Sequence, residues 1–156
     1  MYKKILVPLD GSKLAECALP HVEEIASKCG VDVVLISVTE RVRGYRPVDS
    51  YDSPSGESLI PEVAGKLEKQ GQRYLNRIAR GLESKGIKVH TEILMGNPAE
   101  EIIIYAKTEK CDLIIMASHG RSGPSRWTHG SVADKVLKSS PTTVMMVRAP
   151  GCPQAV

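Results

Sequence analysis

The sequence contains no phenylalanine and only one tryptophan among its 156 residues, although 42% of them are apolar. A hydrophobic core must therefore be built mainly from Val, Ile, Leu and Ala. No apolar run approaches the roughly 18 residues that a membrane-spanning helix needs, and the N-terminal apolar run is too short for a signal peptide. At this length we expect one domain that buries roughly two thirds of its unfolded surface, with no contact to a membrane.

Other classes of site lack their signatures. None of the four cysteines lies at a C-x-x-C spacing, so we expect reduced thiols in a cytoplasmic protein. The 21 basic and 18 acidic residues give a net charge of +3, too small and too evenly spread to indicate nucleic acid as a partner. The four histidines show no metal-ligand spacing, and we expect each to be a surface or turn residue. Neither a Walker lysine motif nor a Rossmann glycine fingerprint is present.

Strand-like apolar runs alternate with segments of helical periodicity. Strands are predicted for 4–9, 31–38, 87–94, 113–116 and 142–148, and helices for 12–29, 61–84, 98–110 and 130–139. This alternation implies right-handed crossovers. We therefore expect an α/β fold, a single-domain three-layer sandwich with a five-stranded parallel sheet and helices on both faces. Residues 1–148 would form the domain and 149–156 a frayed tail.

Several residues mark where the predicted helices begin and end. Ser12 can cap the first helix, and Gly30 suits its end. Asn97 can cap the third helix, with Pro98 in its first position. The inward stripe of the second helix would be Leu67, Tyr74, Leu75, Ile78 and Leu82.

Between the second strand and the second helix, at about 40–60, the periodicity disappears. Glycine, proline, serine and mixed charges in this segment predict a long mobile loop. A loop of that length in a compact domain is either functional or disordered, and the sequence leaves both interpretations open.

The most informative stretch runs from Asp112 to Val132. A short apolar strand, Leu113–Met116, is followed by a loop with glycines at 120, 123 and 130, and then by a helix. The first turn of a helix has backbone N–H groups without partners and carries partial positive charge, and glycine lets an anion approach the backbone. This order of elements is typical of a phosphate-binding site.

In open parallel sheets a ligand binds beyond the carboxyl ends of the strands, where the strand order reverses. Three segments meet that description: 8–10 after the first strand, 38–39 after the second, and 116–120 after the fourth. We expect them to converge on one crevice.

The residues of this crevice resemble those of the universal stress protein family, and the resemblance covers nearly the whole chain. Nucleotide-binding members of the family carry Gly-x2-Gly-x9-Gly-Ser/Thr after the fourth strand. Here the motif reads Ala117-Ser118-His119-Gly120, nine further residues, and Gly130-Ser131. The opening ILVPLDGS and the closing PTTVMMVR are equally typical. Ala117 replaces the first glycine of the motif, and its methyl group matters only if the backbone needs a positive φ.

The resemblance implies an ATP site, with roles carried over by position. Asp10 would accept hydrogen bonds from the ribose hydroxyls, and the backbone of Val38 would bind the adenine edge. Pro8 and Leu9 would line the base. The residues implied next to the sugar are Met116 and Ala117.

The same resemblance assigns the phosphates to Gly120, Gly130, Ser131 and Val132, through backbone N–H groups and the Ser131 hydroxyl. Arg121 lies in the loop and can pair with phosphate oxygens. A Mg²⁺ or Mn²⁺ ion would bridge the phosphates with few protein ligands.

Simpler interpretations exist for individual residues. Asp10 can shape a turn before Ser12, and Gly130 can be a helix cap with Ser131 an ordinary early helix residue. The loop contains Ser118 and His119 but no acidic partner near them, so we expect binding, with at most slow hydrolysis or autophosphorylation as reported for the family. A phosphoacceptor domain would need an aspartate after the third strand, where 95–97 reads Met-Gly-Asn.

Two functions therefore remain for the chain as a whole. One is an ATP-binding regulatory or stress-response protein. The other is an interaction protein of the same fold that binds no nucleotide. The resemblance also implies a homodimer through the last strand, where Thr142–Val147 is apolar and β-branched enough to form a sheet edge.

Overall fold

The computed structural model describes residues 1–40, 59–121 and 130–151, apart from the side chains of 59–62. Residues 41–58 of the loop expected at about 40–60, and residues 152–156 of the expected tail, lie outside these described residues. Residues 59 and 60, at the end of the expected loop, already belong to a helix.

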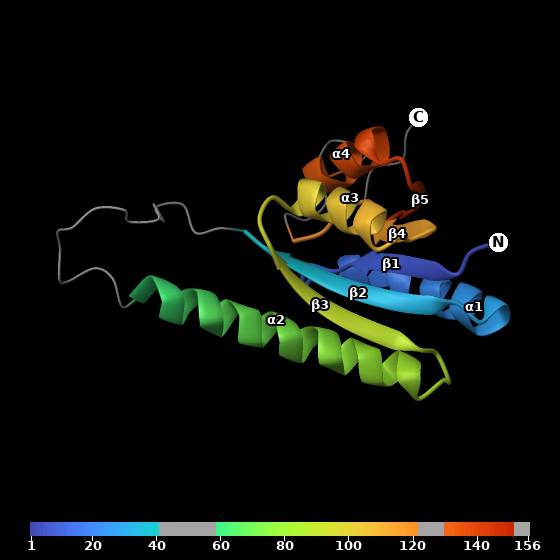
Figure 1. The fold of residues 1–156 in the computed structure, drawn as a ribbon, viewed down its shortest axis with the longest axis horizontal. Helices are drawn as coiled ribbons and strands as arrows, with labels where there is room; N and C mark the ends of the chain where they lie inside the picture. The colour runs from blue at the N-terminus through green and yellow to red at the C-terminus, as the bar shows by residue number, and fades with distance from the viewer. Residues whose placement is uncertain (41–58, 122–129, 152–156) are drawn as a thin grey trace.

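One parallel sheet organises the chain. Its strands are β1 (Lys4–Pro8), β2 (Asp32–Thr39), β3 (Val89–Met95), β4 (Leu113–Ala117) and β5 (Thr143–Val147). They lie side by side in the order β3-β2-β1-β4-β5. The helical elements are the 3₁₀ helix η1 (Ala15–Ala18) and the α-helices α1 (Leu19–Cys29), α2 (Leu59–Glu83), α3 (Pro98–Thr108) and α4 (Ser131–Ser139). The predicted five-stranded parallel α/β sandwich is confirmed (Figure 1).

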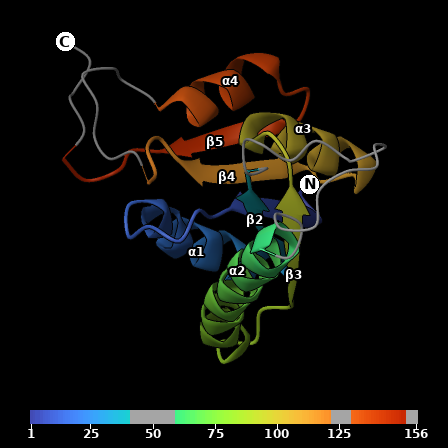
Figure 2. The same cartoon turned by 90° about the vertical axis from the view of Figure 1, so that its left-hand side faces the viewer.

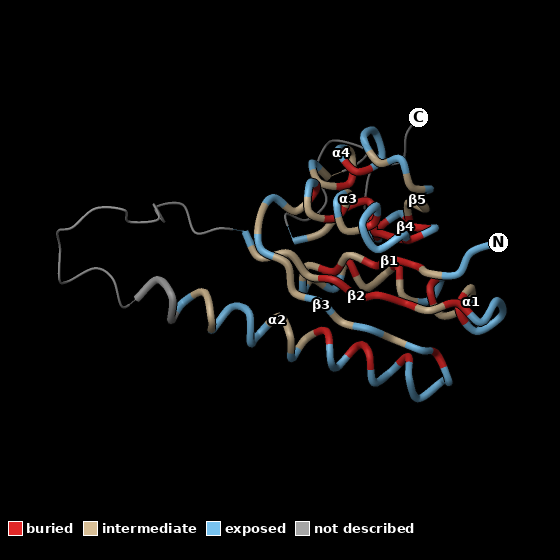
Figure 3. Tube along the Cα trace, viewed as in Figure 1, coloured by how far each residue is buried: buried red, intermediate tan, exposed pale blue. Residues whose placement is uncertain are grey.

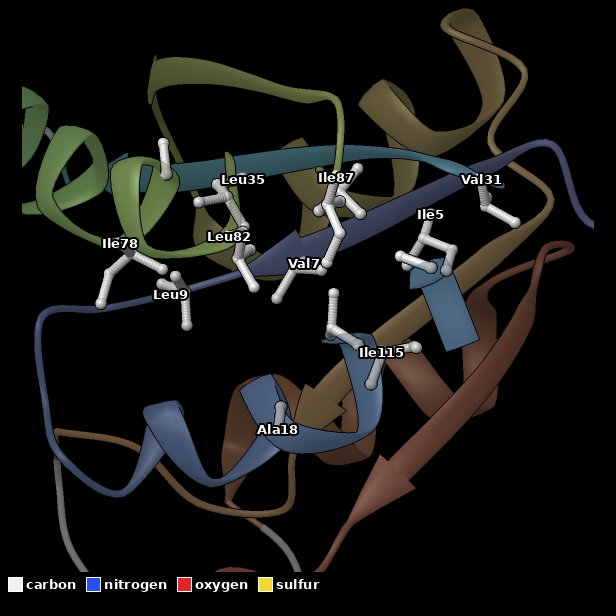
Figure 4. Close-up of a cluster of buried hydrophobic side chains, with 14 of the residues drawn as sticks. Ile5, Val7, Leu9, Ala18, Val31, Leu35, Ile78, Leu82, Ile87 and Ile115 are labelled. Atoms are coloured by element: carbon white, nitrogen blue, oxygen red, sulfur yellow. The ribbon is translucent and has the colours of Figure 1, made fainter. Parts of the chain in front are cut away.

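The helices cover both faces of the sheet. Figure 2 shows α1 and α2 on one side, and α3 and α4 on the other. Successive residues of a strand point to opposite faces, and β1 illustrates this: Ile5 and Val7 pack with the helices of the first face, Leu6 with those of the second. Figure 4 shows the first of these clusters, which includes Leu35 of β2, Ile115 of β4 and Leu82 of α2. The central strands are buried on both faces (Figure 3).

Three of the predicted helix signals are confirmed. Gly30 ends α1 in the left-handed conformation with φ 62°. The Asn97 side chain caps α3 by accepting a hydrogen bond from the Glu100 backbone N–H at 3.3 Å. Pro98 occupies the first position of that helix.

The prediction of a continuous helix from Ser12 is wrong. The chain forms a turn and then η1, and the α-helix begins only at Leu19. Pro20 explains the difference, because it has no N–H to donate and its ring obstructs the carbonyl of the preceding turn. It is tolerated where it stands, in the first turn of α1. The Ser12 hydroxyl accepts a hydrogen bond from the Ala15 N–H at 3.2 Å and so supports the turn.

Leu67 does not belong to the inward stripe of α2. Its side chain is 39% exposed, because the first turns of α2 extend past the sheet (Figure 1). The remaining members fit the prediction: Leu75, Ile78 and Leu82 are buried and Tyr74 packs against them.

Among the helices that the structure describes, none combines the length and the apolar composition that a membrane span requires.

Asp112, just before β4, ties the two central strands together at their amino ends. Its Oδ2 accepts hydrogen bonds from the backbone N–H groups of Lys3, at 2.7 Å, and Lys4, at 2.9 Å. These bonds, first that from Lys3, hold the pKa of the Asp112 carboxyl below its ordinary value. Folding therefore favours the charged form of this group.

We predict that Asp112→Ala lowers the free energy of unfolding at pH 7 by about 1 kcal/mol, a value reduced for exposure to solvent. Because folding lowers the pKa, the stabilisation is present above the unfolded pKa of about 3.9 and is lost as the pH falls through the folded value. Urea unfolding at several pH values measures it. Asp32→Asn, which removes only a surface pair with Lys88, is the control. A loss of stability that does not depend on pH would contradict the assignment.

Candidate functional site

The site lies where the order of strands reverses. β1 and β4 are neighbours at the centre of the sheet. After β1 the chain continues to η1 and α1 on the first face, and after β4 it continues to α4 on the second. The two chain segments diverge at the carboxyl ends of these strands, and a crevice opens between them, as expected for an open α/β sheet.

A cleft with a volume of about 770 Å³ lies at this position. Every residue predicted from the sequence lines it: Pro8, Leu9, Asp10, Val38, Met116, Ala117, Gly120, Arg121, Gly130, Ser131 and Val132. Three strand ends and the start of α4 thus contribute to one cavity, as the convergence of parallel strands requires. A volume of this size suits a small-molecule ligand.

The carboxylate of Asp10 is already engaged. Its Oδ1 accepts hydrogen bonds from the Ser12 backbone N–H at 2.9 Å and from the Ser12 hydroxyl at 2.6 Å. Its Oδ2 accepts a hydrogen bond from the backbone N–H of Arg121. The simpler interpretation, that Asp10 shapes a turn, therefore describes part of what this side chain does, and it faces the cleft at the same time.

Gly120 is required by the close approach of Asp10. A Cβ atom added at residue 120 would overlap the Asp10 carboxylate. The absence of a side chain lets the carboxylate reach the next backbone N–H, that of Arg121. This glycine of the motif thus has a steric reason that does not depend on any ligand.

Ala117 occupies its place without backbone strain. It is the last residue of β4, pairs with Val147 of β5, and is 7% exposed. Within the described ranges, Lys110 alone among non-glycine residues has a positive φ. The condition under which a methyl group would be unfavourable at this position is therefore not met.

Ser118 connects the cleft to both neighbouring elements. Its backbone N–H donates to the Val147 carbonyl at 2.7 Å, and its own carbonyl accepts from the Gly130 N–H at 2.7 Å. The hydroxyl accepts from the Ala149 N–H at 3.0 Å and shares a 3.1 Å hydrogen bond with Nδ1 of His119. Ser118 and His119 are each only 2% exposed. The expectation that every histidine lies on the surface or in a turn is therefore wrong for His119.

The amino end of α4 provides the hydrogen-bond donors. Gly130 is the N-cap, in extended conformation, and no described side chain caps the helix. Its N–H is committed to Ser118, and its carbonyl accepts from the Asp134 N–H at 2.9 Å. The N–H groups of Ser131, Val132 and Ala133 follow in the first turn, where a helix has no internal acceptor for them. They are the donors that the helix presents to an anion.

One wall of the cleft escaped the sequence analysis. It comes from α2 and consists of Leu67, Gln70, Gly71 and Tyr74. The periodic pattern assigned Leu67 and Tyr74 to the core, and it could not reveal that the middle of α2 lines the cleft. Burial, followed by the negative charges of Glu16 and Asp10, raises the pKa of Tyr74 well above its ordinary value. This side chain is therefore neutral near pH 7.

Sheet order, cleft and helix terminus together define an open α/β protein with a cleft at its switch point. Residues 1–148 match the model of the universal stress protein family, and the chain belongs to that family. It is 35% identical to universal stress protein MJ0531 of Methanocaldococcus jannaschii, over 96% of this chain and 84% of that one.

Solved structures agree with this assignment. The structure of MJ0577 from the same organism has a TM-score of 0.83 and 35% identity, covering 97% of this chain and 99% of that one. A universal stress protein family member from Arabidopsis thaliana, solved with AMP bound, shares the fold with a TM-score of 0.66 and 17% identity, covering 96% of this chain and 93% of that one. Some structures with this fold thus hold a nucleotide.

We predict that Gly120→Ala lowers the free energy of unfolding by about 1–3 kcal/mol, because the new methyl group displaces Asp10. Chemical denaturation measures the change. Gly81→Ala in α2, where an added Cβ meets nothing within 4 Å, is the matched control and should be neutral or stabilising. In an Asp10→Ala background the penalty at 120 should shrink, since the overlapping group is gone. An equal penalty in both backgrounds would show that the contact with Asp10 is not the reason for this glycine.

Proposed function

We propose that this protein binds ATP in the cleft and acts as a nucleotide-dependent regulatory protein of the stress response. The observation that supports this most directly is the separation of charges. A carboxylate, Asp10, lies beside the end of β1, and the first turn of α4 presents N–H donors at another part of the same cleft. A carboxylate is a good acceptor for the vicinal hydroxyls of ribose, and a helix N-terminus favours phosphate.

In this arrangement the phosphates bind to the backbone N–H groups of Ser131, Val132 and Ala133 and to the Ser131 hydroxyl. Gly130 contributes space, since its own N–H donates to Ser118. Gly120 also contributes space, because a side chain at this position would overlap the Asp10 carboxylate.

The base and sugar lie on the apolar part of the cleft. Pro8 and Leu9 line the base, the Val38 backbone binds its polar edge, and Met116 and Ala117 pack beside the ribose. Met116 and Ala117 are only 6% and 7% exposed, so they present a fixed surface. The AMP bound to the Arabidopsis protein of the same fold supports a nucleotide in this family.

A Mg²⁺ or Mn²⁺ ion would accompany the phosphates. Over the described part of the chain, no group of three or more His, Cys, Asp or Glu residues is placed to hold a metal ion. Mg²⁺ keeps several of its waters and binds the phosphate oxygens of a nucleotide, so such an ion would need few protein ligands. The Ser131 hydroxyl is the protein ligand best placed to join them.

Binding is proposed in preference to dedicated catalysis. The best nucleophile near the phosphate end is the Ser118 hydroxyl, and it accepts a hydrogen bond from the Ala149 N–H and shares another with His119. Ser118 is only 2% exposed, which gives a substrate little access to this hydroxyl. At most slow hydrolysis fits this site, and a cytoplasmic location suits a protein that responds to the ATP pool.

We predict that Gly130→Asp raises the dissociation constant for ATP at least about tenfold, because it places a negative charge beside the phosphates. The variant should fold normally, since an added Cβ at 130 meets only ordinary contacts, the nearest at 3.4 Å, and aspartate is a favourable N-cap. Calorimetric titration measures the affinity. Gly130→Asn has the same shape without the charge and is the control. Equal ATP affinities in the two variants would contradict the placement of the phosphates at the start of α4. A wild-type protein that does not bind ATP would leave the protein as an interaction module with an unused cleft.

We also propose a homodimer through β5. In the described residues β5 pairs with β4 alone, so its other edge is open. Its Val144, Met145 and Met146 are half-buried. Pairing with a second copy would satisfy that edge and cover these side chains.

We predict that native mass spectrometry finds twice the chain mass of 17.0 kDa, with bound nucleotide adding to it. Thr143→Lys, which places a charge at the start of the exposed edge, should shift the population toward monomer by repelling its symmetry mate. Ser27→Lys on the exposed side of α1, away from both β5 and the cleft, is the control. A wild-type protein that stays monomeric at micromolar concentration would contradict the dimer.

A further inference from the structure

Arg121 bridges the two central strands across the crevice. Its backbone N–H donates to Oδ2 of Asp10, and its guanidinium Nη2 donates to the Asp10 carbonyl oxygen at 2.6 Å. Residue 121 therefore holds both the side chain and the backbone of residue 10. The bridge joins the end of β1 to the loop after β4, directly beside the cleft.

The acceptors on the Asp10 carboxylate are nearly exhausted by this arrangement. A carboxylate has about four lone-pair positions for hydrogen bonds. Three are taken, by the Ser12 N–H, the Ser12 hydroxyl and the Arg121 N–H. Two vicinal hydroxyls need two acceptor positions. A sugar that binds Asp10 through both hydroxyls must therefore displace one of the existing donors.

Of these three donors, the backbone N–H of Arg121 is the one that a sugar can displace most readily. The Ser12 bonds are local and belong to the turn that leads into η1. Arg121 is exposed and lies after β4, so it can move without disturbing that turn. Its guanidinium, once released from the Asp10 carbonyl, is a bidentate donor for phosphate oxygens.

We propose that Arg121 is a specificity-determining residue that makes the cleft prefer a nucleoside phosphate over the bare nucleoside. This inference rests on the proposed function and deepens it. A nucleoside alone must break the Asp10–Arg121 bridge and receives nothing in return from the guanidinium. A nucleotide breaks the same bridge, and the released guanidinium then binds its phosphates. The two parts of the ligand are coupled through one side chain.

The test measures the dissociation constants of adenosine and of ATP for the wild-type protein and for Arg121→Ala by calorimetric titration. Adenosine should bind the variant about threefold more tightly, because the guanidinium bond to the Asp10 carbonyl is gone and the backbone N–H of residue 121, which alanine keeps, is then easier to displace from the carboxylate. ATP should bind about tenfold more weakly, because a charge-assisted phosphate contact is lost. The two affinities thus move in opposite directions. Arg121→Gln, which keeps more of the side chain's bulk, should behave alike.

Lys138→Ala in α4 is the matched control, because it also removes one positive charge and affects only a surface pair with Asp134. Both of its affinities should stay within about twofold of wild type. Unchanged or weaker adenosine binding in Arg121→Ala would overturn the inference while the proposed function stands. A wild-type protein that binds neither ligand would overturn the proposed function, and this inference with it.

Discussion

The reversal of strand order between β1 and β4 is the constraint on which the rest of this structure depends. Both strands are buried on both faces, so the polar groups of the loops that follow them must find partners at the carboxyl edge of the sheet. Asp10 and Ser118 are the first polar residues after these two strands, and each organises its own surroundings. The cleft between them follows from this arrangement.

Ser118 connects the cleft to the edge strand β5 and to the start of α4. Its backbone contacts Val147 and Gly130, and its hydroxyl contacts Ala149. The cap of α4 and the end of β5 are thus held by one residue. A ligand that displaces the first turn of α4 would also displace the end of β5 through Ser118. We propose β5 as the dimer contact. The structure therefore connects the cleft to the end of β5 through one residue.

Much of this could be predicted from the sequence, because the signals involved act between residues that are near one another in the chain. Apolar runs such as 113–116 are long enough to define strands, and caps such as Asn97 act on their nearest neighbours. The convergence of residues 8–10, 38 and 116–120 follows from parallel topology alone. The prediction of a continuous helix from Ser12 was wrong, although Pro20, the residue that prevents it, was visible in the sequence.

What could not be read depends on contacts between distant segments. The bond from Arg121 to Asp10 joins residues 111 positions apart, and no periodicity encodes it. The same holds for Leu67, which fits a helical stripe but extends past the sheet, and for His119, whose burial is set by Ser118 and its neighbours.

A titration of ¹⁵N-labelled protein with ATP and Mg²⁺, followed by amide chemical shifts, tests the central claim most directly. Our account predicts that the largest shifts occur at residues 131–133 and at Arg121, and that adenosine leaves 131–133 nearly unmoved. No amide shifts at these positions at millimolar ATP, or shifts spread evenly over the surface, would contradict this account.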